Sequence, residues 1–115
     1  MPHCIIEYSA DIELSASDLM EAVYNGAVSS QLFENDHIKT RCIAYQDYLK
    51  GDKREHIIHI SARILSGRTA EQRKLLSLVI LNAVTKLAES QRLKAITITV
   101  EVIEMERHSY SKKEL

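Results

Sequence analysis

The second half of the chain has two segments of two-residue hydrophobic alternation on either side of one amphipathic segment, and this order restricts the possible folds most. Residues 56–64 place alternate isoleucines on one face, and residues 95–102 alternate without a break. A period of two is typical of half-buried strands. Between them, Thr69 and Gln72 form a capping box for a helix. Its apolar stripe consists of Leu75, Leu76, Val79, Ile80, Ala83, Val84 and Leu87. The second half is therefore a predicted β-α-β unit.

The first half repeats this order. Residues 2–8 and 38–48 have the β-branched and aromatic content of strands. The segment 15–32 is a predicted helix, with Ser15 as its N-cap and a buried stripe of Leu19, Val23 and Ala27. Gly26 is unfavourable inside that helix.

The two halves have nearly equal spacing, which favours a duplicated unit. About 36 residues separate the first strand from the second and about 37 the third from the fourth, and residues 9–12 resemble residues 61–64 at an offset of 52. The pseudo-repeats span about 2–50 and 54–104. A turn at Lys50-Gly51-Asp52 predicts a hairpin between strands 38–48 and 56–64.

These observations predict one α/β (α+β) domain over residues 1–115, with a four-stranded sheet and two helices on one face. Right-handed crossovers place both helices on the same side. The other face is too apolar for open water, so a partner subunit is expected to cover it. The polar tail from residue 106 is expected either to be loose or to reach a neighbour.

Composition excludes several classes of function. The 115 residues carry a formal charge of −1, which gives no overall attraction to nucleic acid or an anionic membrane. No apolar run approaches the ~20 residues of a membrane helix, and a cytoplasmic protein is expected. Cys4 and Cys42 have no zinc-binding or disulfide spacing. With three glycines, no phosphate-cradling loop or dinucleotide motif can form. We therefore expect no metal and no cofactor, and any catalysis depends on acid–base groups and charge.

Pro2 is the single proline of the chain. Removal of the initiator methionine is favoured when the second residue is small, and it would expose a secondary amine. Burial beside cations lowers the pKa of such an amine, because both effects disfavour the ammonium form. A neutral amine near pH 7 is a suitable general base. The alternative is that proline is only a processing-compatible second residue.

Three basic residues are candidates for binding an anion. Arg68 directly precedes the second helix, where unpaired amides and the helix dipole favour a carboxylate. Lys39 and Arg41 lie two apart on one strand and therefore on one face. The alternatives are a surface arginine beside a cap and an ordinary solvated strand face. His59 and Arg63 are interpreted as structural or interfacial.

Several segments resemble a known family over nearly the whole chain. The start Met1-Pro2-His3, the run Ile38-Lys39-Thr40-Arg41 and the run Ile64-Leu65-Ser66-Gly67-Arg68 resemble the 5-carboxymethyl-2-hydroxymuconate isomerase family of the tautomerase superfamily. Residues 64–72 are also similar to the start of the short 4-oxalocrotonate tautomerases, in which Ile-Leu-Glu-Gly-Arg leads into the first helix.

The resemblance implies a tautomerase fold, a homotrimer, no cofactor, and an amino-terminal proline that acts first as base and then as acid. Pro2 would take the enol proton of a 2-hydroxymuconate-type acid and return a proton to a distant carbon. Arg68 would bind a carboxylate or the developing dienolate charge. The strand motif often reads Ile-Arg-x-Arg in this family. Because Lys39 replaces its first arginine, bidentate carboxylate binding would fall to Arg41 or be replaced by a point charge.

The leading hypothesis is a cofactor-independent isomerase that ketonises an unsaturated 2-hydroxy di- or tricarboxylic acid from aromatic catabolism. Its catalytic residues would be Pro2, Arg68 and Arg41, and Lys39, Arg41 and Arg68 would bind the substrate. One alternative is a superfamily member with a different enol substrate. Another is a non-enzymatic, ferredoxin-like binding or assembly module, which has the same element order.

Overall fold

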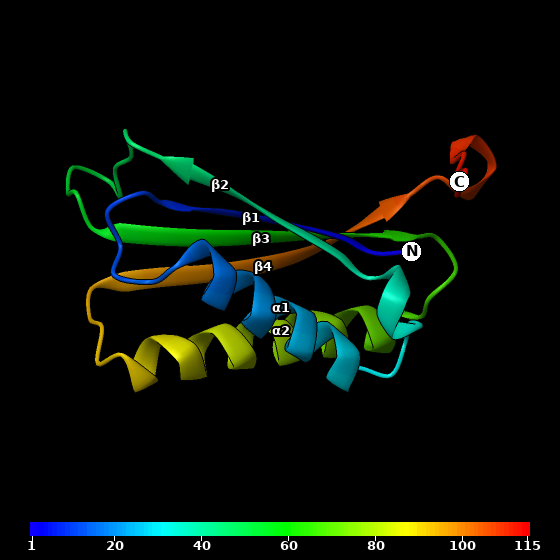
Figure 1. The fold of residues 1–115 in the computed structure, drawn as a ribbon, viewed down its shortest axis with the longest axis horizontal. Helices are drawn as coiled ribbons and strands as arrows, with labels where there is room; N and C mark the ends of the chain where they lie inside the picture. The colour runs from blue at the N-terminus through cyan, green and yellow to red at the C-terminus, as the bar shows by residue number, and fades with distance from the viewer.

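The computed structural model describes residues 1–115 and confirms the β-α-β-β-α-β order (Figure 1). The elements are β1 (His3–Ser9), α1 (Ala16–Ser29), β2 (Lys39–Tyr45), β3 (His56–Leu65), α2 (Ala70–Ser90) and β4 (Ile96–Met105), with 3-10 turns η1 (Asn35–His37) and η2 (Arg107–Ser109). Helix α1 ends before the predicted residue 32. Ser29 and Ser30 donate hydrogen bonds to carbonyls of the last turn, and Gln31 has a φ of 59°. Strand β4 is longer than predicted because its pairing continues to Leu65 and Met105.

The four strands lie in the order β2-β1-β3-β4. Strand β1 is parallel to β2 and β3 is parallel to β4, while β1 and β3 are antiparallel at the centre. The predicted hairpin between the second and third strands is therefore wrong. Strand β1 lies between them. Each helix connects two strands that pair in parallel, so β2 lies beside β1 and β4 lies beside β3, and the two units join through β1 and β3. This arrangement also differs from the ferredoxin-like split β-α-β unit, in which another strand separates the parallel pair.

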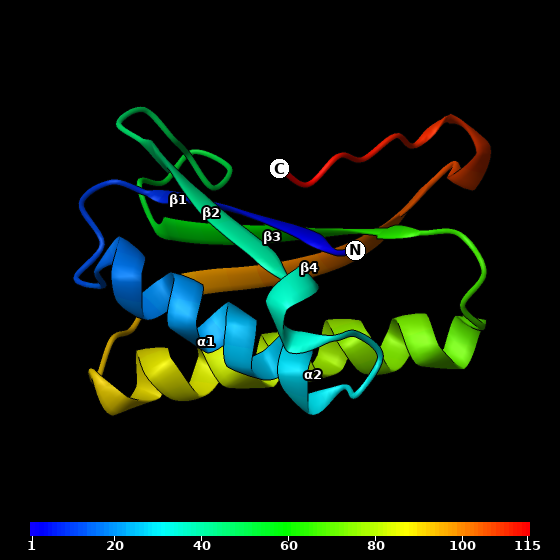
Figure 2. The same ribbon diagram turned by 45° about the vertical axis from the view of Figure 1, so that its right-hand side comes forward.

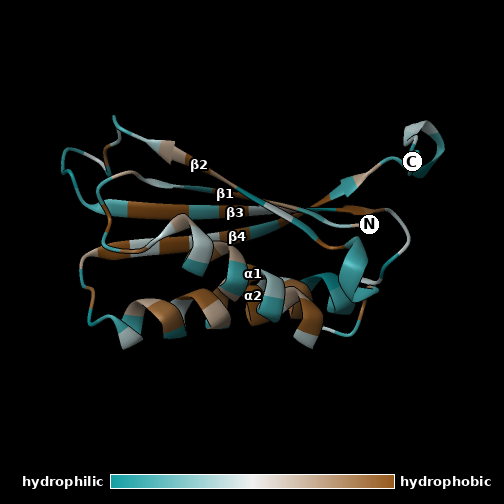
Figure 3. Cartoon of the chain, in the orientation of Figure 1, coloured by the Kyte–Doolittle hydropathy of each residue, from teal (hydrophilic) through white to brown (hydrophobic).

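Both helices cover one face of the sheet, as predicted, and the core lies between the two layers (Figures 1 and 3). The largest fully buried side chains come from both units and include Ile6, Leu19, Ile58, Ile60, Ile64, Leu76 and Ile80. The sequence match between residues 9–12 and 61–64 has no structural counterpart, since Ser9 ends β1 and Ser61 lies inside β3. The duplication is one of element order rather than of that local sequence.

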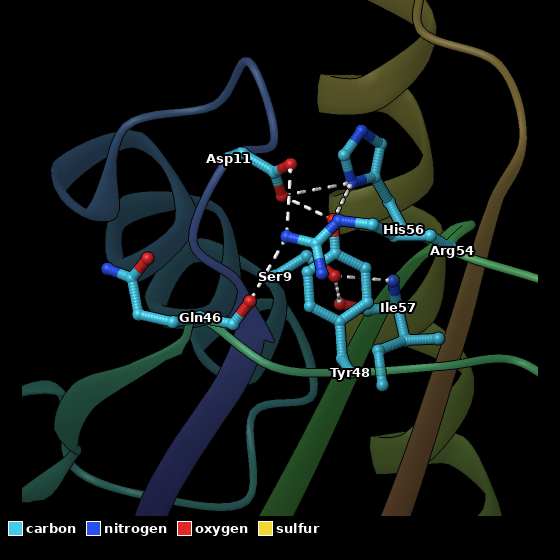
Figure 4. A network of polar contacts seen from close by, with 7 residues as sticks. All are labelled: Ser9, Asp11, Gln46, Tyr48, Arg54, His56 and Ile57. Carbon is cyan, nitrogen blue, oxygen red and sulfur yellow. Dashed lines mark hydrogen bonds and ion pairs between the residues drawn. The ribbon is translucent and has the colours of Figure 1, made fainter.

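A polar network holds the loop after β2 against the end of the sheet that is farthest from the N-terminus (Figure 4). The Tyr48 hydroxyl donates a hydrogen bond to Asp11, which raises the pKa of Tyr48 and lowers that of Asp11. It also accepts one from Nδ1 of His56 at 3.1 Å. The Arg54 guanidinium lies 4.4 Å above the Tyr48 ring and pairs with Asp11 at 3.5 Å. These contacts explain why strand β2 ends at Tyr45 rather than at residue 48.

The sheet face opposite the helices has no second layer in this chain. Ile43 and Tyr45 on it are 47% and 41% exposed. Its polar side chains are largely paired with one another. Tyr45 donates a hydrogen bond to Glu7 at 2.5 Å, and Nε2 of His59 lies 3.4 Å from Glu101. The face therefore combines exposed apolar side chains with paired polar groups.

The helices approach closely where α1 has its glycine. A Cβ atom added to Gly26 would lie 3.0 Å from both Ile80 Cα and Val79 O, and 3.3 Å from Ala83 Cβ. The residue that was unfavourable for helix formation is thus required by the packing of α1 on α2. Tertiary close approach outweighs the intrinsic helix propensity at this position.

We predict that Gly26→Ala lowers the free energy of unfolding by about 1–3 kcal/mol, the usual cost of overpacking. Alanine would improve local helix propensity by about 1 kcal/mol, so a loss demonstrates the tertiary constraint. Urea titration would measure the change, with Asn25→Ala at the neighbouring exposed position as the control. A Gly26→Ala protein as stable as the wild type would contradict this account.

Candidate active site

Strand directions bring four distant segments to one end of the sheet. Strand β1 begins there, and His3 pairs with Lys39 at the start of β2 and with Arg63 near the end of β3. Strand β4 ends there, since its last residue, Met105, pairs with Leu65. The N-terminus, the start of β2, the turn after β3 and the C-terminal segment are therefore neighbours (Figure 2).

The predicted base lies at this meeting point. Pro2 is fully buried, and its carbonyl accepts a hydrogen bond from the Lys39 amide at 3.0 Å. Met1, by contrast, is partly exposed. It lines an open cavity of about 280 Å³ together with Arg68, His37, Gln31, Leu32, Phe33 and Glu34. Met1, which carries the amine of the unprocessed chain, and the predicted anion-binding residue Arg68 therefore line the same cavity.

Arg68 is held at this cavity by contacts across the fold. Its Nη2 donates to the Leu32 carbonyl at 2.7 Å, and its guanidinium lies 5.0 Å from the centre of the Phe33 ring. The next residue, Thr69, caps α2 with the predicted box to Gln72. These contacts use one of the five N–H donors of Arg68 and leave the others available for a carboxylate.

The turn that carries Arg68 depends on a glycine and on the C-terminal segment. Gly67 has a φ of 127°, a conformation that residues with a side chain rarely adopt. Arg107 donates from Nε and Nη2 to the Ser66 carbonyl at 3.1 and 2.7 Å. Arg107 therefore acts on the site by fixing the turn before Arg68.

The two basic residues of β2 take different positions. Lys39 stands at the start of the strand, and its ammonium donates to the His37 carbonyl at 3.3 Å, beside the cavity. Arg41 lies two residues further along, and its Nη1 is 3.3 Å from Nδ1 of His3. The structure thus brings Lys39 and Arg68 to the N-terminal amine and places Arg41 against His3.

Cations from four elements surround the amine. Burial lowers the pKa of the Met1 amine below its usual 8.0, and the charges of Arg68, Lys39, Lys112 and Arg107 lower it further. Like charges disfavour an ammonium ion, so the environment favours a neutral amine. The same cations attract anions. This end of the sheet can therefore combine a weak base with a site for carboxylates.

Sequence analysis missed the contributions of the C-terminal segment and of His37. The segment turns back along the open side of the sheet toward the N-terminus (Figure 2), where Tyr110 meets Nε2 of His3 at 2.9 Å and Lys112 reaches Met1. Its residues have no strand or helix periodicity, so only tertiary contacts reveal their place. The structure contains no group of three or more metal-ligating side chains, and neither helix is long and apolar enough to cross a membrane.

A sequence comparison agrees with the geometry of this end of the fold. The model of the family described as 5-carboxymethyl-2-hydroxymuconate isomerase matches residues 2–115, starting at Pro2. The chain belongs to this isomerase family. A comparison with curated proteins finds no match. The family assignment makes the protein an isomerase, as the resemblance implied.

Solved structures show the same fold at low sequence identity. A 5-carboxymethyl-2-hydroxymuconate isomerase from Deinococcus radiodurans has a TM-score of 0.85 at 18% identity, over 99% of this chain and 90% of that one. A 5-carboxymethyl-2-hydroxymuconate delta-isomerase has a TM-score of 0.83 at 16% identity, over 99% of this chain and 88% of that one. A fused 4-OT symmetric trimer has a TM-score of 0.77 at 15% identity, over 96% of this chain and 90% of that one. These similarities confirm that the chain has the tautomerase fold.

The contacts of His3 define its protonation state. Arg41 can only donate, so Nδ1 of His3 accepts and Nε2–H donates to Tyr110. Burial and the charge of Arg41 lower the pKa of His3 below its usual 6.5. The folded protein therefore holds neutral histidine at a pH where the unfolded chain binds a proton.

This difference predicts a pH-dependent loss of stability. As the pH falls from 7.5 to 5.5, His3 becomes protonated first in the unfolded chain, so the free energy of unfolding decreases. Urea titrations at three pH values would show a smaller decrease for His3→Gln, whereas the other histidines contribute equally to both proteins. The depressed pKa of Asp11 matters only below its usual 3.8, outside this window. Identical slopes for the two proteins would count against the assigned tautomer.

Proposed function

We propose that this isomerase ketonises an unsaturated 2-hydroxy di- or tricarboxylic acid of the 5-carboxymethyl-2-hydroxymuconate type, with the Pro2 amine as base and then as acid. The observation that carries the proposal is the cationic end of the sheet, where Lys39 is bonded to Pro2 and the preceding residue, Met1, lines a cavity with Arg68. The family description supports the substrate class. Removal of Met1 is part of the proposal, because only then does Pro2 have a free amine.

The proposed reaction moves one proton without a cofactor. The neutral Pro2 amine takes the proton of the 2-hydroxyl group, and the electrons shift along the diene as a dienolate forms. The resulting prolinium returns a proton to the distant carbon, which yields the conjugated 2-oxo isomer. Arg68 binds a carboxylate or the developing oxyanion, since a fixed cation stabilises charge that appears in the transition state. Lys39 supplies a point charge at the other side of the amine.

Arg41 stays a proposed site residue with a less direct position. Its guanidinium contacts His3, the first residue of β1, and lies on the sheet face that the helices leave open. From there it can bind a carboxylate that extends from the cavity along that face. The proposed substrate-binding set is thus Arg68 and Lys39 at the amine and Arg41 beside them.

A homotrimer is the proposed assembly. The open sheet face exposes Ile43 and Tyr45, and its carboxylates Glu7 and Glu101 are bonded to Tyr45 and His59. Burial of these groups against another copy costs little desolvation free energy. Two of the structurally similar proteins are described as trimers. Sedimentation equilibrium would test the assembly against the 13.1 kDa mass of one chain, and a monomer at micromolar concentration would reject it. We further propose a cytoplasmic location and a role in aromatic catabolism, as the sequence analysis expected.

The second candidate is another enol substrate on the same machinery. Solved structures with the same fold include a malonate semialdehyde decarboxylase, at 15% identity and a TM-score of 0.71 over 96% of this chain and 88% of that one. The fold thus accommodates different reactions. A panel of hydroxymuconates and arylpyruvate enols would separate the two candidates, since only the first predicts a preference for polycarboxylates.

We predict that Pro2→Ala lowers kcat for 2-hydroxymuconate ketonisation by about 10²–10⁴-fold, the usual contribution of general acid–base catalysis. Absorbance assays of substrate ketonisation would measure the rate, and an unchanged free energy of unfolding in urea would show an intact fold. Insertion of a lysine between Met1 and Pro2 prevents removal of Met1 and should abolish activity equally. Intact mass identifies the processed form. A loss below tenfold in Pro2→Ala would indicate a different base.

A further inference from the structure

The C-terminal segment contributes a cation that neither the reaction scheme nor the β2 and turn motifs use. Lys112 reaches back across the fold, and its Nζ lies 3.4 Å from Sδ of Met1. Only 33% of its side-chain surface is exposed. Met1 in turn lines the cavity that contains Arg68 and His37. Lys112 therefore adjoins the volume that the Met1 side chain occupies, next in the chain to Pro2.

The segment is held in this position by contacts at two points before Lys112. Arg107 makes two hydrogen bonds to the Ser66 carbonyl, and Tyr110 meets His3 at 2.9 Å. Both partners belong to segments that meet at the candidate site, namely the turn before Arg68 and the start of β1. The position of Lys112 is thus fixed by the same elements that hold the site.

A carboxylate of the chain itself already binds this ammonium. Oε1 of Glu114 lies 2.6 Å from Nζ of Lys112, and the Glu114 side chain is 72% exposed. The hydrogen bond from Lys112 lowers the pKa of Glu114, and the charges of His37 and Lys39 lower it further. Glu114 therefore lies in the field of the site cations, where a carboxylate of a ligand would experience the same attraction.

The cations and their free donors match a substrate with three carboxylates. Arg107 spends two of its donors on the Ser66 carbonyl and so holds the turn. Arg68 and Lys39 each donate one hydrogen bond to a protein carbonyl and keep other donors free. Lys112 contacts only Met1 and Glu114, and a ligand can displace Glu114. Arg68 with Lys39, or with Arg41 beside them, supplies the two cations that a dicarboxylate needs. A further carboxylate on the C-terminal side of the cavity would need another cation, and Lys112 is the one that this segment provides.

We infer that Lys112 is a substrate-binding residue that selects tricarboxylates over dicarboxylates, and that Glu114 occupies its ammonium until the third carboxylate of the substrate displaces it. The inference rests on the proposed function, since Met1 must leave for the substrate to lie between Pro2 and Lys112. It adds a specificity role for the C-terminal segment, and it requires no further residue in the chemical step.

Kinetics with two substrates would test this role. Lys112→Met should raise KM for 5-carboxymethyl-2-hydroxymuconate about tenfold and leave its kcat within about twofold, because uniform binding is lost. KM for 2-hydroxymuconate, which lacks the third carboxylate, should change less than twofold. Lys113→Met is the matched control and should change neither value. Glu114→Gln should lower KM for the tricarboxylate only, because the competing carboxylate is gone.

Binding of unreactive acids would separate this inference from the proposed reaction. Tricarballylate and glutarate differ by one carboxylate, so calorimetric titration of the processed protein reports the third contact without turnover. Lys112→Met should weaken tricarballylate binding about tenfold and glutarate binding less than twofold. This difference supports the inference even if neither hydroxymuconate is turned over. Equal losses for the two acids, no binding of tricarballylate to the wild type, or the same effect from Lys113→Met would overturn it.

Discussion

The antiparallel pairing of β1 with β3 at the centre of the sheet is the constraint on which the rest of the structure depends. It joins two units that are each parallel within themselves, and its register opposes Cys4 to Ala62 and Ile6 to Ile60. These four side chains are fully buried under the helices. A shift by one residue would turn them to the open face, so burial of the core sets the register.

The same pairing creates the site. Because β1 and β3 run in opposite directions, the start of the chain lies beside the end of β3 and the turn that carries Arg68. The parallel partners then bring the start of β2 and the end of β4 to the same edge. Cations therefore gather around an amine that is far from each of them in sequence. Their mutual repulsion opposes folding. Burial and the charge of these cations lower the pKa of the Met1 amine, and the same charge makes the cavity attractive to carboxylates.

Two glycines are required for different reasons, one for packing and one for the candidate site. Gly26 allows α1 to approach α2, which closes the core, and a side chain there would contact the backbone of α2. Gly67 instead allows the turn that aims Arg68 into the cavity, with Arg107 bonded to the carbonyl before it. One glycine supports the layer that covers the sheet, and the other supports the site at its edge.

Local periodicity by itself determined the helices and strands, since a period of two or of 3.6 decides which residues can share a buried face. The capping box at Thr69 and the Ser15 cap were likewise readable, because they involve neighbours in the chain. Pro2, Arg68 and Lys39 could be proposed from sequence because they adjoin recognisable turns and strand starts. The strand order could not be predicted from the sequence. The hairpin prediction assumed that consecutive strands pair, whereas β1 lies between β2 and β3. The roles of Lys112, Arg107 and Tyr110 were decided only by the tertiary structure, because their contacts bridge more than 40 residues and leave no periodic pattern.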